Sequence, residues 1–147
     1  MTAAKLWIVL SRCHHALEQL VERDIASLGL CVSDFTTLEA LLHKGPLTIS
    51  EIQAKVLLAS GSMTAAVDRL EKRGLVVRKP VANDRRARLL ELTPEGRELI
   101  SKVFDEHARH LEEAASALDE SEKHQMYDGL KKLGRSVAAR LDGRHET

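Results

Sequence analysis

The chain has 147 residues, no formal net charge and 44% hydrophobic residues. This length and apolar content fit one compact domain or one subunit of an oligomer, and they leave no room for a separate cofactor-binding sheet. Because the sequence has no transmembrane run, signal peptide or lipidation motif, we expect a cytoplasmic protein with no membrane partner. In the reducing cytosol its two cysteines are expected to form no structural disulfide.

The chain is predicted to begin with two helices. Apolar residues recur at helix-like intervals from Lys5 to Leu28, which favours a long first helix. A second helix is predicted from Ser33 to His43, and it ends before Gly45 and Pro46. Its inward-facing residues are expected to be Phe35, Leu38, Leu41 and Leu42.

The next two helices are predicted to form a helix-turn-helix. Thr48, with Glu51 three residues later, is typical of a capping box, and this short helix ends near Val56. After a turn, a serine can cap another helix, which stops at a left-handed Gly74. Such a pair of helices is typical of a DNA reader, because the second helix fits the major groove.

The second of these helices, the reader helix, has an apolar and a polar face. Met63, Val67 and Leu70 recur at helical spacing and are expected to face the core. The opposite face is expected to hold Ser62, Ala65, Ala66, Arg69 and Arg73. Small residues let a helix approach base edges, hydroxyl groups can donate to phosphates or bases, and an arginine offers two donors to one base. An ordinary amphipathic helix with a solvated face would show the same pattern.

A hairpin is predicted directly after the reader helix. The runs 75–78 and 88–92 are β-branched or rich in Leu, and Pro80 and the Asn83-Asp84 pair between them are turn signals. The tip gathers Arg85, Arg86 and Arg88, and such a basic cluster on a thin ribbon favours a polyanion. Residues 44–92 hold ten Lys or Arg against five Asp or Glu, so a basic module is joined to an acidic remainder.

Two long helices are predicted to complete the chain, from Pro94 to about Ala117 and from Asp119 to about Leu141. A helix of about 24 residues spans roughly 36 Å, which is longer than a small domain needs. We therefore expect the terminal helices to pack on a partner, and packing within a monomer is the alternative.

Several motifs, in this order, resemble the MarR (multiple antibiotic resistance) family of regulators. They are Leu47-Thr48, Leu58 to Thr64, Asp68 to Val76, Asn83 to Arg86 and Leu92 to Gly96. The resemblance covers nearly the whole chain. It implies a mainly α fold with a small antiparallel β-wing, that is, a winged helix-turn-helix with N- and C-terminal dimerisation helices.

The resemblance also implies how the chain is organised. Residues 1–147 would be a single subunit, with a winged helix-turn-helix DNA-binding lobe at 33–92 and a helical dimerisation region at 1–30 and 94–141. A homodimer would present two reader helices to a pseudopalindromic operator in double-stranded DNA. The implied function is a sequence-specific transcriptional regulator, most simply a repressor released by a ligand or by oxidation.

In that family the wing Asp orients the loop through an ion pair and the Arg two positions later enters the minor groove. This implies those roles for Asp84 and Arg86, while Arg85 can contact phosphate. The residues expected at the DNA are Ser60, Ser62, Thr64, Ala65, Arg69, Arg73, Asp84, Arg85 and Arg86. A winged-helix protein-interaction module is the alternative, and the basic wing argues against it.

One hypothesis for regulation is a sensor thiol. The reader-helix sequence looks most like the branch of the family that responds to organic hydroperoxides, quinones or hydroquinones, whose redox members place a reactive Cys in the first helix. Here the equivalent position lies near Trp7, about six residues before Cys13. This offset argues against a family-type sensor thiol. Redox sensing by Cys13 or Cys31 is kept as a hypothesis, with a buried, inert Cys as the alternative.

The other hypothesis is a small phenolic or other aromatic effector, which family members bind in a cleft between the dimer helices and the DNA-binding lobe. Trp7, His14, His15, Phe35 and His43 can reach such a cleft, although an aromatic residue at helical spacing is usually core. The effector would act through a different affinity for two spacings of the reader helices.

No cofactor, metal or enzyme activity is expected. His107 and His110 can share one helix face, but no Cys or carboxylate completes a ligand set, so they are interpreted as surface histidines. The predicted fold also brings together no nucleophile, base and orienting group, and the sequence has no Gly-rich phosphate loop.

Overall fold

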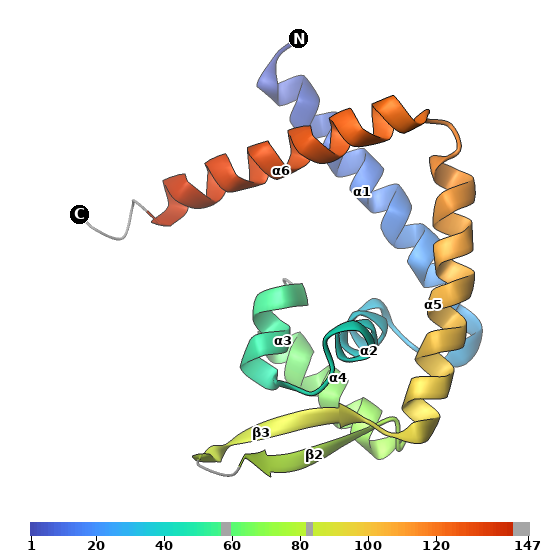
Figure 1. Ribbon diagram of the computed structural model, residues 1–147, viewed down its shortest axis with the longest axis vertical. Coiled ribbons are helices and arrows are strands. Elements are labelled where there is room, and N and C mark those ends of the chain that lie inside the picture. The colour runs from blue at the N-terminus through green and yellow to red at the C-terminus, as the bar shows by residue number, and fades with distance from the viewer. Residues whose placement is uncertain (57–59, 82–83, 143–147) are drawn as a thin grey trace. The chain divides into compact units, whose positions relative to one another are not determined.

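A computed structural model describes residues 1–56, 60–81 and 84–142, except for the side chains of Val56, Ser60, Ser62, Arg85 and Arg86. The chain divides into two compact units, Met1–His110 and Leu111–Thr147. The elements (Figure 1) are α1 Ala3–Ile25, the 3-10 helix η1 Ala26–Leu28, α2 Val32–Lys44, β1 Leu47–Thr48, α3 Ile49–Val56, α4 Ser60–Lys72, β2 Val76–Val81, β3 Asp84–Leu92, α5 Pro94–Ala115 and α6 Glu120–Asp142. The expected mainly α fold with a small antiparallel wing is confirmed.

The core of the first unit is formed by α2, α3, α4 and the sheet, closed by residues of α1 and α5. The predicted inward residues Met63, Val67 and Leu70 of α4 are fully buried. They pack with Phe35, Leu38 and Leu41 of α2 in one apolar cluster. Burial of each large apolar side chain contributes about 1.5 to 3 kcal/mol, so this cluster fixes α4 against α2. Ala66 was expected on the outer face and that prediction is wrong, because Ala66 is 0% exposed.

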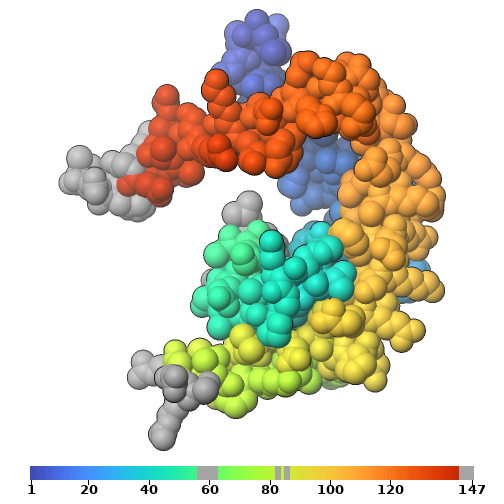
Figure 2. Space-filling view, viewed as in Figure 1, coloured from blue at the N-terminus to red at the C-terminus, as the bar shows by residue number. Residues whose placement is uncertain are grey.

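The sheet has three antiparallel strands in the order β1-β3-β2. The predicted hairpin is confirmed, with Val76 opposite Leu92 at its base, and its strands extend further toward the tip than the sequence indicates. The pairing of β1, Leu47 opposite Leu90, was not predicted, because two residues are too few to show an alternating pattern. Figure 2 shows the hairpin lying directly beside α2 and α3.

Local hydrogen bonds set the helix ends that the sequence predicted. Thr48 N donates to Glu51 Oε2 at 2.7 Å and Glu51 N donates to Thr48 Oγ1 at 3.3 Å, so the capping box of α3 is confirmed. The contact from Thr48 N lowers the pKa of Glu51. Gly74 follows α4 with φ of 71°, which is the left-handed conformation expected for the stop.

The start of α5 lies against the end of α4. Thr93 Oγ1 donates to Gly74 O at 2.6 Å and accepts from Gly96 N at 3.0 Å, while Thr93 N donates to Leu75 O at 3.1 Å. A Cβ atom at Gly96 would lie 1.9 Å from Leu75 O. The Leu-Thr-x-x-Gly motif therefore joins the reader helix to α5 by a close backbone approach.

Within the first unit, a buried carboxylate joins α1 to α5. The Asp24 side chain is 3% exposed and lies between His107 and His110, which are 6% and 18% exposed. His107 also packs edge-on against Phe35, with ring centroids 5.4 Å apart. The interpretation of both residues as surface histidines is therefore wrong. The sequence did not reveal this contact, because Asp24 lies 83 residues away from His107.

In the second unit, α6 carries a stripe of exposed apolar residues. They are Met126, Tyr127, Leu130, Leu133, Val137 and Leu141, and their spacing places them on one side of the helix. Among the described residues, no single helix is long and apolar enough to cross a membrane; Ala3–Leu28 and Val32–Lys44, bent by 90°, meet that test of length and composition only as a pair.

Candidate nucleic-acid interface

The N-terminal half of α4 presents small residues to solvent. Thr64 and Ala65 are exposed, as the sequence predicted, while Met63 and Ala66 on the other side are buried. Ser60 and Ser62 precede them on the same helix, and their side chains lie outside the described part of the structure. A helix surface of this kind can approach base edges closely.

Arg69, expected to read a base, is turned toward α2. Its Nη2 and Nε donate to Asp34 Oδ1 at 2.7 and 3.2 Å. The Asp34 side chain is 3% exposed, whereas that of Arg69 is 46% exposed. The hydrogen bond with Asp34 raises the pKa of Arg69, which keeps the guanidinium charged.

Arg73, one turn further along, is also held within the subunit. Its Nη2 donates to Leu28 O at 2.9 Å and its Nη1 donates to Gly29 O at 3.0 Å. These carbonyl groups end the 3-10 helix after α1. DNA contact by Arg69 and Arg73 stays a prediction, and the structure shows internal partners for both.

Arg78 of β2 joins the wing to the reader helix, a role that the sequence did not reveal. It pairs with Asp68 and, at 3.0 Å, with Glu71, both on the exposed side of α4. Lys79, its neighbour on β2, pairs with Glu91 across the hairpin. These ion pairs neutralise charge near the base of the wing.

The wing begins its return strand at Asp84. Asp84 Oδ1 accepts from Ala87 N at 3.3 Å, which orders the backbone that carries Arg85 and Arg86. The side chains of Arg85 and Arg86 lie outside the described part of the structure, so their roles and the ion pair of Asp84 stay predictions.

A polar hollow lies between the start of α3 and the wing. It has a volume of about 370 Å³ and is lined by Thr48, Ile49, Ser50, Asp84, Ala87 and Arg88. Backbone N–H groups at the start of a helix favour an anion, and so does a guanidinium. The Asp84 carboxylate in the same lining disfavours an anion, so the hollow has mixed charge.

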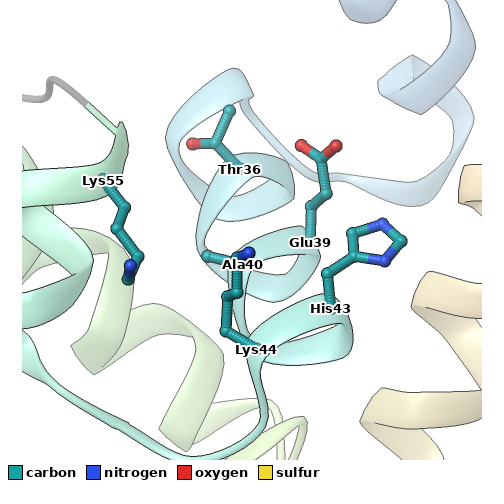
Figure 3. Close-up of a pocket in the computed structure, with 6 residues that line it drawn as sticks. All are labelled: Thr36, Glu39, Ala40, His43, Lys44 and Lys55. Atoms are coloured by element: carbon teal, nitrogen blue, oxygen red, sulfur yellow. The ribbon is translucent and has the colours of Figure 1, made fainter.

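A second hollow, also of about 370 Å³, lies beside α2. It is lined by Thr36, Glu39, Ala40, His43, Lys44 and Lys55. Figure 3 shows Lys55 on α3 and the other five residues on the neighbouring helix α2. The surface of this hollow is mostly made of the carbon atoms of these side chains, and it carries the two amines of Lys44 and Lys55 beside the carboxylate of Glu39, so it can hold a small phenolic molecule.

The residues expected in an effector cleft do not meet in this hollow. His43 lines it and packs edge-on against Phe104 at 4.5 Å. Phe35 is 2% exposed in the core, and Trp7 and His14 lie on the exposed surface of α1. Sequence periodicity cannot separate a core aromatic from a cleft aromatic, because both occupy inward positions.

The two cysteines have different surroundings. Cys13 is exposed on α1, whereas Cys31 precedes α2 with its Sγ 3.1 Å from both Ser33 Oγ and Arg69 Nη2. Neither forms a disulfide, and both are exposed in the single chain, so neither is buried in the core of its own subunit. Cys31 therefore lies at a contact between α2 and the reader helix.

Comparisons with known proteins agree with this geometry. Residues 30–87 match the model of the MarR family. The chain is 38% identical to the HTH-type transcriptional regulator MhqR of Bacillus subtilis, over 88% of this chain and 90% of that protein. It is 31% identical to the transcriptional repressor MprA of Escherichia coli, over 92% and 78% of the two chains.

Solved structures share the fold. A mutant MarR from Escherichia coli in complex with operator DNA has a TM-score of 0.75 and 24% identity, over 90% of this chain and 99% of that one. An organohalide-sensing transcriptional regulator in its 2,4-dichlorophenol-bound form has a TM-score of 0.79 and 21% identity, over 90% and 79%.

Proposed function

We propose a function for this chain from one premise, that it belongs to the MarR family. The protein is a homodimeric, sequence-specific regulator of transcription, most simply a repressor, and each subunit binds half of a pseudopalindromic operator. The observation that carries this function is the pairing of a small-residue surface on α4 with a basic hairpin in one compact unit. The reader helix enters the major groove and the wing follows the neighbouring minor groove.

The contacts divide by chemistry. Thr64 and Ala65, with Ser60 and Ser62 before them, approach base edges, while Arg85 and Arg86 enter the minor groove or hold its phosphates. The lobe at 33–92 supplies all of these groups.

The dimer is formed by the terminal helices. In α6 six apolar side chains are exposed within the single chain, and α1 exposes Leu6, Trp7, Ile8, Val9 and Leu17. Exposed apolar groups of this number on long helices are normally covered, because exposed apolar area costs about 25 cal/mol for each Å². A second copy covers them and brings two reader helices to one face of the DNA.

A small effector regulates the dimer. A structural neighbour is described with 2,4-dichlorophenol bound, and the hollow beside α2 offers side-chain carbon atoms and the amines of Lys44 and Lys55, with the carboxylate of Glu39 in the same lining. A phenolate suits such a site, since its charge meets an amine and its ring meets apolar atoms. Oxidation at Cys13 or Cys31 is the second route, favoured by the exposure of both thiols.

A wing variant tests DNA binding against the alternative of a protein-interaction module. Arg86→Ala should lose most of its affinity for duplex DNA and reduce the salt dependence of binding by about one phosphate contact per subunit, with the dimer retained. Arg97→Ala is the matched control, since Arg97 is exposed on α5. Equal DNA affinity and salt dependence of the Arg86 and Arg97 variants would contradict the proposal.

A further inference from the structure

We propose that Arg69 and Arg73 are positioning residues, which hold the reader helix α4 to the connection between α1 and α2 and do not themselves read bases. This inference rests on the proposed function, because it concerns how the helix is held for DNA. It assigns the two arginines of the predicted reader surface to a different task from that of Thr64 and Ala65.

The first contact occupies one pair of donors of the Arg69 guanidinium, Nε and Nη2. Arg69 uses Nε and Nη2 on Asp34 Oδ1, at 3.2 and 2.7 Å. Nη2 also lies 3.2 Å from Ser33 Oγ and 3.1 Å from Cys31 Sγ. Reading guanine takes a pair of donors from one guanidinium, so this pairing competes directly with base contact.

Breaking the ion pair between Asp34 and Arg69 is energetically unfavourable. The Asp34 side chain is 3% exposed, and its other oxygen accepts from Cys31 N at 3.2 Å, where it caps α2. A buried carboxylate without its cation is costly, because the charge has lost its water and gained no partner. The pair is therefore part of the folded subunit rather than a side chain waiting for DNA.

The second contact holds the same connection. Arg73 donates to Leu28 O and Gly29 O, at 2.9 and 3.0 Å. Carbonyl groups at a helix end lack partners within the helix, so the guanidinium satisfies them. Arg69 and Arg73 are four residues apart and lie on one side of α4.

Both arginines thus hold the segment from Leu28 to Asp34, which joins α1 to α2. α1 exposes the apolar residues Leu6 to Val9 and Leu17, which we assign to the dimer, and α4 is the reader helix. A shift of α1 can therefore reach α4 through these side-chain contacts, which form a physical link between the dimer and the DNA surface.

The variant Asp34→Asn separates positioning from base reading, because Asp34 has no positive charge to offer DNA. We expect its affinity for a duplex from upstream of its own gene to fall roughly 2- to 30-fold. This is the range expected for a substitution that changes the coupling between two sites without contacting the ligand of either site. Its affinity for scrambled duplex and its salt dependence should stay unchanged. Asp105→Asn, an exposed change of the same charge on α5, is the control.

If Arg69 instead reads a base, Asp34→Asn frees the guanidinium, and specific affinity stays equal or rises. A double variant gives a second criterion. Arg69→Ala combined with Asp34→Asn should cost little more than either change alone, because both remove one contact. Additive losses, or a salt dependence reduced by about one contact in Arg69→Ala, would overturn the positioning role.

Arg73→Lys keeps the proposal testable if the Asp34 variants do not fold. Lysine keeps the charge but cannot span two carbonyl oxygens as a planar guanidinium does, so specific affinity should fall at unchanged salt dependence. Full retention of specific affinity would contradict positioning by Arg73. If the wild-type dimer itself does not prefer the upstream duplex over scrambled DNA, the proposed function fails first, and this inference fails with it.

Discussion

Asp24 on α1 and His107 on α5 lie 2.8 Å apart, measured from Oδ2 to Nδ1. The other carboxylate oxygen of Asp24 lies 2.8 Å from Nδ1 of His110. Arg109 Nη2 lies 2.8 Å from Nε2 of His110, and a guanidinium can only donate, so Nε2 accepts and Nδ1 donates to Asp24. Burial raises the pKa of Asp24. The hydrogen bonds with His107 and His110 together lower this pKa by more than burial raises it, so the net pKa shift is downward.

The sign of this shift predicts a loss of stability in acid. The pKa of Asp24 is lower in the folded chain than its ordinary value of 3.8, so its ionised form stabilises the fold above that pH. The contribution is lost as the pH falls through the folded-state pKa. Asp24→Asn should lower the free energy of unfolding by about 1 to 3 kcal/mol at neutral pH.

Urea unfolding at neutral pH and near pH 3 measures this contribution. The difference between wild type and Asp24→Asn should shrink in acid, whereas Asp105→Asn should differ little from wild type at neutral pH. An equal difference at both pH values would mean that the charge of Asp24 is not what stabilises the fold.

The close packing at Gly96 leads to a second prediction, an effect on the free energy of unfolding that does not depend on pH. Because a Cβ atom there would meet Leu75 O at 1.9 Å, Gly96→Ala must separate α5 from the end of α4. We expect a loss of about 1 to 3 kcal/mol in the free energy of unfolding, as for overpacked sites. Glu95→Ala, at an exposed neighbouring position, should change it by less than about 0.5 kcal/mol. Wild-type stability of Gly96→Ala would show that the close approach is dispensable.

Elements that depend on local patterns could be predicted from the sequence. The helices follow apolar spacing, the capping box follows Thr48 and Glu51, and the hairpin follows its turn residues. The partners of Arg69 and Arg73 could not be predicted, because they lie 35 and 45 residues away and periodicity records only which face a residue occupies. One signal was available: Asp34 stands beside Phe35 on the inward side of α2, where a carboxylate requires a cation.

The apolar stripe of α6 predicts the behaviour of the dimer. Leu130→Asp places a charge in the middle of the stripe, and burying it in an interface without a partner is unfavourable. Sedimentation velocity should show a shift from dimer to monomer at micromolar concentration. Lys132→Asp, on the opposite side of α6, should remain a dimer. A dimeric Leu130→Asp variant would place the interface elsewhere.

The hollow beside α2 predicts a ligand specificity. Lys55→Ala removes one of its two amines, so binding of a phenolic acid such as 4-hydroxybenzoate should weaken about tenfold, the value of one charged hydrogen bond. Isothermal titration of wild type, Lys55→Ala and the exposed control Lys102→Ala measures this loss. The effector would have another site if Lys55→Ala and Lys102→Ala bound the acid equally well.

A fluorescence titration of the wild-type protein with duplex DNA from upstream of its own gene, beside a scrambled duplex at the same salt concentration, tests sequence-specific binding most directly. We predict that the upstream duplex binds about 10³-fold or more tightly than the scrambled one, as for specific regulators. Equal affinity for the two duplexes at every salt concentration would contradict the assignment of α4 and the wing to operator recognition.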